Sequence, residues 1–228
     1  MAGAWQLGIE SSTGRASVAL ARGEEVLREA AVETGRKPSA ALMEPLREVL
    51  AALPGGERLE AVVIGTGPAS YNGARVGIAA GQGVALAAGC PAVGVCSFLG
   101  VEAVRGGDRC LAVGDARRET YFILPLAAGR LSGGVSLMPH TDFIRSLEAG
   151  DGRLISFEGG ERLHLPPEVA ARLEVVEPEA RLLLEAWRGM SGEDREEARE
   201  IPPEPFYLRE PYVTTAKDNP ARRGRDGA

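Results

Sequence analysis

Residues 61–95 of this chain decide its fold: AVVIGTGPASYNGARVGIAAGQGVALAAGCPAVGV. The stretch opens with four apolar residues, 61–64, which is the pattern of a short strand buried on both faces. A glycine-rich turn, 65–73, leads into a run that is compatible with a helix to about Ala88. Residues 91–95 then form a second short apolar segment. Strand, glycine turn, helix and strand together predict a βαβ unit.

The helix of this unit carries small residues at every fourth position, Gly73, Gly77, Gly81, Ala85 and Gly89, so they share one face. Each interior glycine destabilises a helix by roughly 1 kcal/mol relative to alanine, so the packing of this face has to stabilise the helix by more than that. A ridge without side chains lets another backbone come unusually close. We expect the ridge to pack on the chain's own sheet. The alternative is that the ridge, or the stripe beside it, meets a partner protein.

The glycine turn also has the composition of an anion-binding loop, because consecutive N–H groups at a helix start can hold a phosphate. It lacks the specific motifs, however. A Walker loop needs Gly-Lys-Ser/Thr, whereas Gly73 is followed by Ala74 and Arg75. A dinucleotide fingerprint needs a third glycine where Ser70 stands. The turn is therefore only a weak indication of phosphate binding.

The composition excludes several classes of protein. The chain has 228 residues, 44% of them apolar, and a net charge of -6. An acidic chain is not suited to hold nucleic acid alone, because phosphate neutralisation supplies most non-specific affinity. Three cysteines without a CxxC motif indicate free, buried thiols in a reducing compartment. No apolar run approaches the roughly 18 residues of a membrane span, and the first residues do not resemble a signal peptide. We expect a cytoplasmic protein that does not bind membranes.

The chain begins with three apolar segments joined by turn residues, Trp5–Ile9, Ala16–Ala21 and Val26–Val32. They predict an antiparallel meander. The first segment ends in a carboxylate, Glu10, thirteen residues before Gly23.

The same pattern returns in the second half. Residues 110–114 are apolar and end in Asp115, fourteen residues before Gly129, and strands are expected at 120–126 and 131–137. A duplicated meander with a carboxylate at the end of its first strand is an internal repeat. Helices are further expected at 98–105, 143–147 and 178–190, and strands at 154–157 and 173–176.

A helix is expected between the first meander and the βαβ unit. Ser39 is a good N-cap, and Pro45 should kink or restart the helix. Ala40, Met43 and Arg47 lie on a face that is mildly apolar and low in charge. That face is either surface next to the core or a docking face for another helix.

Two lobes of βββαβα type, each starting with a strand that ends in a carboxylate, resemble the actin, sugar-kinase and Hsp70 superfamily. That resemblance implies an α/β fold of two RNase H-like lobes with mixed central sheets. Within the superfamily, five motifs between residue 7 and about residue 209 are similar to those of the TsaB (YeaZ) family. These motifs are Leu7-Gly8-Ile9-Glu10-Ser11-Ser12-Thr13, Gly65-x-Gly67-Pro68-x-Ser70-Tyr71-x-Gly73-x-Arg75-Val76-Gly77-Ile78, Gln82-Gly83, Gly94-Val95-x-Ser97 and Glu204-Pro205-x-Tyr207-Leu208-Arg209.

The resemblance predicts how the chain is divided. Residues 1–106 would form an N-terminal actin-like lobe that carries the partner-binding helices. Residues 107–200 would form a second, reduced lobe. Residues 201–228 would be an extended segment and a disordered basic tail.

The resemblance to TsaB implies a protein without catalytic, cofactor-binding or metal-binding residues of its own. It would support TsaD, which carries the metal and transfers the threonylcarbamoyl group to the adenosine beside the tRNA anticodon. TsaB dimerises with itself or with TsaD through helices of its first lobe, and TsaE, an ATPase, joins them, so tRNA would be bound only indirectly. The expected partner interface consists of Ser39, Ala40, Met43, Arg47, Gly73, Arg75, Val76, Gly77, Ala80 and Gly81.

The chain departs from the family pattern at Glu10, where aspartate is usual, and it lacks a histidine that is often found near Pro38. Glutamate at this position weakens the case for a nucleotide-linked role of the first-strand carboxylate. The missing histidine matters less, because TsaB does not depend on a metal.

The enzymatic alternatives fit the residues less well. A metalloprotease needs histidine ligands, and His140 and His164 are far apart in sequence and are expected at the surface. A nuclease of this fold needs several carboxylates around two metals. The strongest alternative is a small-molecule kinase or another ATP-binding enzyme of the superfamily. Such an enzyme needs a glycine turn after each first-strand carboxylate, and residues 116–119, Ala-Arg-Arg-Glu, are not one.

Overall fold

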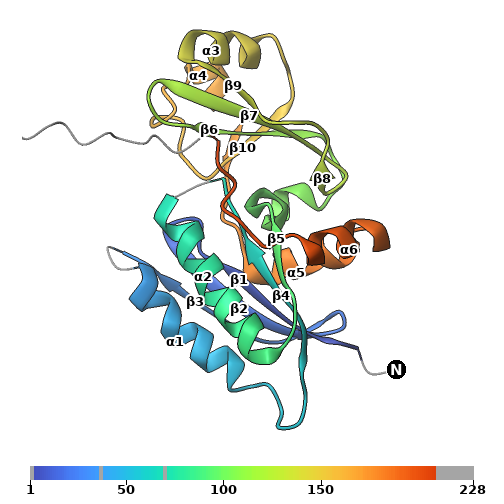
Figure 1. Ribbon diagram of the computed structural model, residues 1–228. Coiled ribbons are helices and arrows are strands. Elements are labelled where there is room, and N and C mark those ends of the chain that lie inside the picture. Colours follow the sequence, from blue (N-terminus) through green and yellow to red (C-terminus); the bar gives the residue numbers. More distant parts are fainter. Residues whose placement is uncertain (1–2, 36–37, 69–70, 209–228) are drawn as a thin grey trace, which may run out of the picture.

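The computed structural model describes residues 3–35, 38–68 and 71–208. The chain is an α/β protein with two mixed sheets, one in each lobe (Figure 1). In the first sheet the strand order is β3-β2-β1-β4-β5. The pairs β1–β2 and β2–β3 are antiparallel, and β4 is parallel to both β1 and β5. The bounds are β1 Trp5–Glu10, β2 Arg15–Arg22, β3 Glu25–Glu33, β4 Leu59–Gly65 and β5 Ala92–Val95.

The second sheet repeats this plan. Its order is β11-β10-β6-β7-β8, with β9 also paired to β7, so a central strand is again flanked by a meander and by two parallel strands. The predicted internal repeat is confirmed at the level of strand order. The bounds are β6 Cys110–Asp115, β7 Thr120–Ala127, β8 Arg130–Leu131, β9 Ser136–Pro139, β10 Arg153–Ser156 and β11 Leu173–Val175.

The strand predicted at 131–137 is interrupted. It forms two short strands, β8 and β9, and both pair with β7. The residues between them include Gly133 and Gly134, which weaken a strand because they have no side chain to pack.

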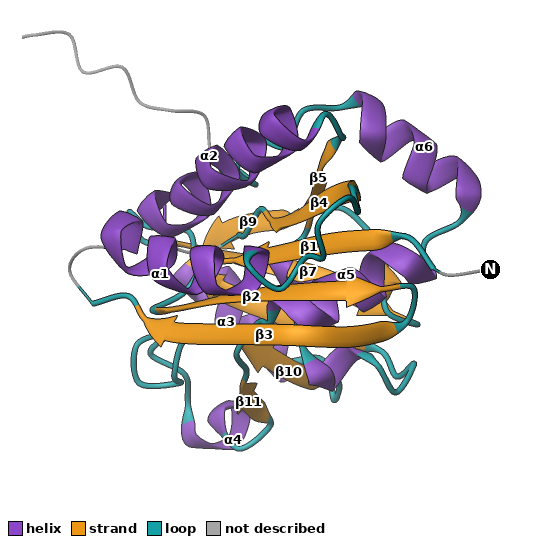
Figure 2. Cartoon of the chain, turned by 90° about the horizontal axis from the view of Figure 1, so that it is seen from below, coloured by secondary structure: helices purple, strands orange, loops and turns teal. Residues whose placement is uncertain are grey.

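Helices α1 (Pro38–Leu50) and α2 (Tyr71–Ala88) contact each other and cover one face of the first sheet (Figure 2). The prediction for the start of α1 was wrong. The helix begins at Pro38, so Ser39 lies in its first turn and is not the N-cap. Of the two outcomes predicted for Pro45, a restart is excluded, because one helix continues from Pro38 to Leu50. The helix predicted at 98–105 is replaced by two 3₁₀ helices, η1 (Ser97–Gly100) and η2 (Glu102–Val104).

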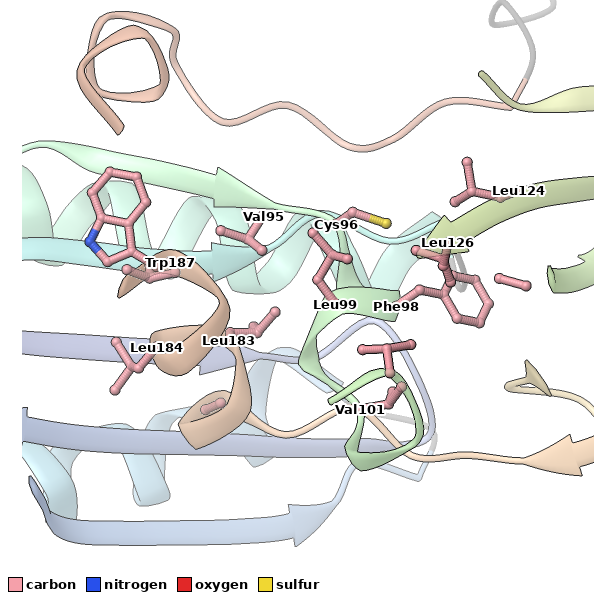
Figure 3. Packing of buried hydrophobic residues seen from close by; sticks show 14 of the residues in the cluster. Val95, Cys96, Phe98, Leu99, Val101, Leu124, Leu126, Leu183, Leu184 and Trp187 are labelled. Atoms are coloured by element: carbon pink, nitrogen blue, oxygen red, sulfur yellow. The ribbon is translucent and has the colours of Figure 1, made fainter. Parts of the chain in front are cut away.

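The opposite face of the first sheet is covered by a helix from the end of the chain, α5 (Ala180–Gly189). Its Leu183, Leu184 and Trp187 are completely buried. They share one apolar cluster with β5 and η1, and the cluster continues into β6 and β7 (Figure 3). The two lobes therefore share a core. The predicted second lobe, 107–200, is wrong for α5, which packs on the first sheet.

The remaining helices are α3 (His140–Glu148), α4 (Pro167–Ala170) and α6 (Gly192–Glu200). Phe143 and Leu147 of α3 and Val169 of α4 belong to the core of the second lobe. The charged helix α6 has no buried residue. The second lobe is reduced because α4 has only 4 residues, whereas α2 has 18. Within the described ranges, no helix combines the length and the apolar character needed to cross a membrane.

Candidate functional site

A cleft of about 830 Å³ lies between the lobes. The first lobe contributes the turn after β1 and the first turn of α2, and the second lobe contributes the β6–β7 turn and the residues after β10. Residues 205–208 also line the cleft. They belong to the C-terminal strap, which is defined here as residues 201–208. The fold thus brings several segments that are distant in sequence to one place.

The first-strand carboxylate, Glu10, is not among the residues that line the cleft. Its side chain is 0% exposed, and its Oε1 accepts a hydrogen bond of 2.6 Å from the backbone N–H of Ser12. Burial raises the pKa of the Glu10 carboxyl, and hydrogen bonds with Ser12, Ser97 and Ser11 oppose this only in part. The side chain lies so close to β4 that a Cβ on Gly65 would be 1.8 Å from Oε2. Glu10 is therefore an internal group of the first lobe.

The matching carboxylate of the second lobe, Asp115, does line the cleft and is partly exposed. Its Oδ1 accepts a hydrogen bond of 2.6 Å from the backbone N–H of Arg117, and its Oδ2 lies 3.3 Å from the Arg117 guanidinium. The backbone N–H of Asp115 donates to Glu158, 2.9 Å away. Glu158 is in turn paired with Arg162 at 2.9 Å. The wall of the second lobe is thus an interlinked set of charged groups.

The turn after Asp115 has an uncommon backbone. Arg117, Arg118 and Glu119 have φ values of 68°, 54° and 58°, in the left-handed region that non-glycine residues seldom adopt. Each such residue costs of order 1–3 kcal/mol, so the surrounding structure has to hold it. Both arginines line the cleft.

The C-terminal strap is tied to the first lobe along its length. The backbone N–H of Phe206 donates to the Thr66 carbonyl at 2.8 Å. Arg75 of α2 donates to the Tyr207 hydroxyl at 2.8 Å, and its guanidinium lies 5.7 Å from the centre of the Tyr207 ring. In Figure 1 the strap is the red end of the described chain, which runs from α6 toward the second lobe. Residues 201–208 form no helix or strand, and the predicted basic tail, 209–228, lies outside the described residues.

The residues predicted for the partner interface divide into two groups. Gly73, Gly77 and Gly81 are buried, and a Cβ on Gly77 would lie 2.4 Å from the hydroxyl of Ser11, which directly follows β1. Close packing on the chain's own sheet is confirmed, so these glycines offer no surface to a partner. The other seven are exposed or half-buried on α1 and α2: Ser39, Ala40, Met43, Arg47, Arg75, Val76 and Ala80.

Sequence reasoning missed one residue of the same surface. Leu86 of α2 is 84% exposed, more than any other large apolar side chain in the described residues. It follows Ala79 and Gly83 at helical spacing, and both are exposed as well. A spacing of four and then three residues along this face, from Ala79 through Gly83, would have found it.

The two histidines, distant in sequence, are close together in the structure. The rings of His140 and His164 have their centres 6.1 Å apart, and His140 Nε2 lies 3.3 Å from the Leu163 carbonyl. His164 is exposed, as expected, and His140 is half-buried. In residues 3–35, 38–68 and 71–208 no group of three or more His, Cys, Asp or Glu side chains could hold a metal ion.

Comparison with known proteins identifies related sequences and folds. A family model described as TsaD, tRNA N6-adenosine threonylcarbamoyltransferase, matches residues 32–124. The solved structure of YeaZ from Pseudomonas aeruginosa superposes with a TM-score of 0.67 at 24% identity, covering 90% of this chain and 100% of that one. A second structure from the same organism, of an uncharacterized protein with similarity to peptidase YeaZ, gives a TM-score of 0.65 at 25% identity, with the same coverage.

Two curated relatives match shorter segments. An uncharacterized protein of Mycobacterium tuberculosis is 38% identical over 64 residues, which is 28% of this chain and 30% of that protein. An uncharacterized protein of Mycobacterium leprae is 40% identical over 90 residues, 37% of this chain and 25% of the relative. The chain thus spans less than a third of the length of these curated relatives. Taken together, the comparisons confirm the resemblance to the TsaB (YeaZ) family.

Proposed function

We propose that this chain acts in tRNA modification as a non-catalytic partner of a TsaD-like threonylcarbamoyltransferase. One observation above all supports this: the TsaD family model matches residues 32–124, which contain both α1 and α2. The likeness to YeaZ across 90% of the chain points in the same direction. In this proposal a TsaE-like ATPase joins the complex, and tRNA is contacted mainly by the partner.

The geometry of the two first-strand carboxylates favours a supporting role over a kinase. A kinase of this fold needs carboxylates and glycine turns that face the phosphates. Here Glu10 is enclosed in the first lobe, and the turn after Asp115 consists of arginine and glutamate in place of glycine. Neither lobe offers the phosphate-binding arrangement that the enzymatic alternative requires.

The proposed partner surface is the α1–α2 face, made of Ala40, Met43, Arg75, Ala80 and Leu86. Met43 is 56% exposed and Leu86 is 84% exposed, so this face leaves large apolar side chains in water. Burying apolar area contributes about 25 cal/mol per Å², which favours association through such a face. When the chain is alone, the same face would form a homodimer.

Charge substitutions on this face test the proposal. We expect Met43→Glu and Ala40→Glu to leave thermal unfolding nearly unchanged, because a charge at an exposed position costs the monomer little. In the complex the carboxylate would be buried without a partner, so dimerisation and pull-down of the cognate TsaD-like protein should both be lost. Size-exclusion chromatography and co-purification measure this.

Val175→Glu is the matched control, because Val175 is 60% exposed and lies on β11 in the other lobe. This variant should fold and still bind the partner. If Met43→Glu folds and binds as well as the control does, the α1–α2 face is not the partner surface.

A further inference from the structure

The two histidines of the chain form a pair in the second lobe that the proposed function does not use. His140 is the first residue of α3, and His164 lies in the turn between β10 and α4. Their ring centres are 6.1 Å apart, with ring planes at 83°. We propose that this pair binds a transition-metal ion that prefers imidazole ligands, such as copper, nickel or zinc, with water in the remaining coordination positions.

The distance between the two rings fits one shared ion. With metal–nitrogen bonds of about 2.0–2.1 Å, the centres of two imidazoles on the same ion lie roughly 4.5 to 6.5 Å apart, depending on the angle at the metal. The separation of 6.1 Å falls within this range. The two side chains can therefore share an ion without a shift of the backbone.

The His140 ring is held in the way that a metal-binding histidine usually is. Its Nε2 lies 3.3 Å from the Leu163 carbonyl oxygen, which can only accept a hydrogen bond, so Nε2 carries the proton in the neutral ring. The lone pair is then on Nδ1. A hydrogen bond from the other ring nitrogen to a backbone carbonyl is the common support of a histidine ligand, because it fixes the tautomer and the ring orientation.

Aromatic neighbours fix the same ring from the side of the core. The centre of the Tyr121 ring lies 4.9 Å from that of His140, and Tyr121 is stacked on Phe143, which is completely buried. The first turn of α3 also contains Asp142, whose negative charge offsets the positive end of the helix dipole. His140 is thus a half-buried ligand with a restricted orientation.

His164 supplies the exposed half of the pair. Its φ is 52°, in the left-handed region, and the backbone N–H groups of Leu163 and Leu165 bond within the same turn, to the carbonyls of Gly159 and Gly160. Leu163 is completely buried, which anchors the turn to the core of the lobe. His164 itself is exposed, so an ion can reach it from solvent.

The ligand set predicts which ions bind. In the part of the chain that the structure describes, no group of three or more His, Cys, Asp or Glu side chains could hold a metal, so the pair would supply two ligands and water the others. Two neutral imidazoles favour copper(II) over nickel(II) and zinc(II), in the general order of stability for nitrogen ligands. Magnesium prefers oxygen ligands and should not compete.

Titration of the full chain with copper(II), followed by calorimetry and by electron paramagnetic resonance, tests the proposal. About one ion should bind with hyperfine coupling to two imidazole nitrogens. Each single substitution should weaken binding by at least about tenfold, because the second ligand of a pair binds as an intramolecular group. Magnesium in excess should leave the titration unchanged.

The substitutions are chosen to keep the fold. His140→Phe retains an aromatic ring beside Tyr121, and His164→Asn retains a residue that tolerates the left-handed conformation. The double variant keeps the free cysteines and gives the background from thiols. Thr141→Ala, an exposed position on the same helix, is the matched control and should bind as the wild type does.

Two results would overturn the proposal. One is coupling to fewer than two imidazole nitrogens in the wild type. The other is a folded double variant that binds copper(II) as tightly as the wild type. Both histidines lie in the second lobe, outside the α1–α2 face, so the titration is independent of the partner proposal.

Discussion

Glu10 carries a carboxyl whose protonation is coupled to folding. Because burial raises its pKa above 4.5, the folded chain holds this proton more tightly than the unfolded chain does. The resulting stability is fully present below the pKa of the unfolded chain. It is lost as the pH rises through the raised pKa of the folded state, by about 1.4 kcal/mol per unit of difference.

Glu10→Gln keeps the size and shape of the neutral acid and removes the titration. We expect the substituted chain to gain stability relative to the wild type as the pH rises from about 4 to 8. Urea unfolding of both proteins across this range measures the difference. The same substitution at the exposed Glu196 of α6 is the control. A stability difference between Glu10→Gln and the wild type that does not change with pH would show that Glu10 is not titrating with folding.

At the scale of single elements, the glycines of α2 allow the effect of packing on stability to be measured separately from the effect of helix propensity. A Cβ on Gly73 would lie 2.2 Å from the backbone carbonyl oxygen of Ser11, which cannot move without shifting β1. A Cβ on Gly81 would lie 2.5 Å from Ile64 Cδ1, the end of a side chain that can rotate. Gly83 is exposed, and a Cβ there would meet nothing within 4 Å.

These surroundings predict an order of stability for three alanine substitutions. Gly83→Ala should stabilise the chain by about 1 kcal/mol through helix propensity alone. Gly81→Ala should be less favourable than that, and Gly73→Ala should destabilise by roughly 1–3 kcal/mol through overpacking. Chemical denaturation gives all three values. A Gly73→Ala chain as stable as the Gly83→Ala chain would contradict the observed packing of α2 on β1.

The elements that were predictable from sequence were those with a strong local pattern. The meander β1–β3, the βαβ unit and the carboxylates at the ends of β1 and β6 all follow from apolar runs bounded by turn residues. The helix start at Ser39 and the helix after Ser97 were wrong because cap residues give only weak local preferences. The Ser97 hydroxyl accepts a hydrogen bond of 3.0 Å from the backbone N–H of Gly67, so this side chain makes a tertiary contact and does not cap a helix.

At the scale of the whole molecule, contacts between segments distant in sequence were not predictable. The sequence of α5 does not show that this helix packs on the first sheet, because an apolar helix face can pack on either sheet. The cleft was likewise missed, because its walls come from several segments that are distant in sequence. Of the residues predicted for a partner surface, Met43 and Arg75 are exposed, whereas the glycine ridge faces the chain's own sheet.

The central claim is that the chain is a non-catalytic partner whose α1–α2 face supports a TsaD-like enzyme. The most direct test is threonylcarbamoylation of tRNA in a mixture of purified components from the same organism, with and without this chain. We predict that product formation requires the chain, is lost with Met43→Glu and is retained with Glu10→Gln. Full activity without the chain would contradict the account. So would loss of activity with a folded Glu10→Gln chain, since that result would give the buried carboxyl a catalytic role.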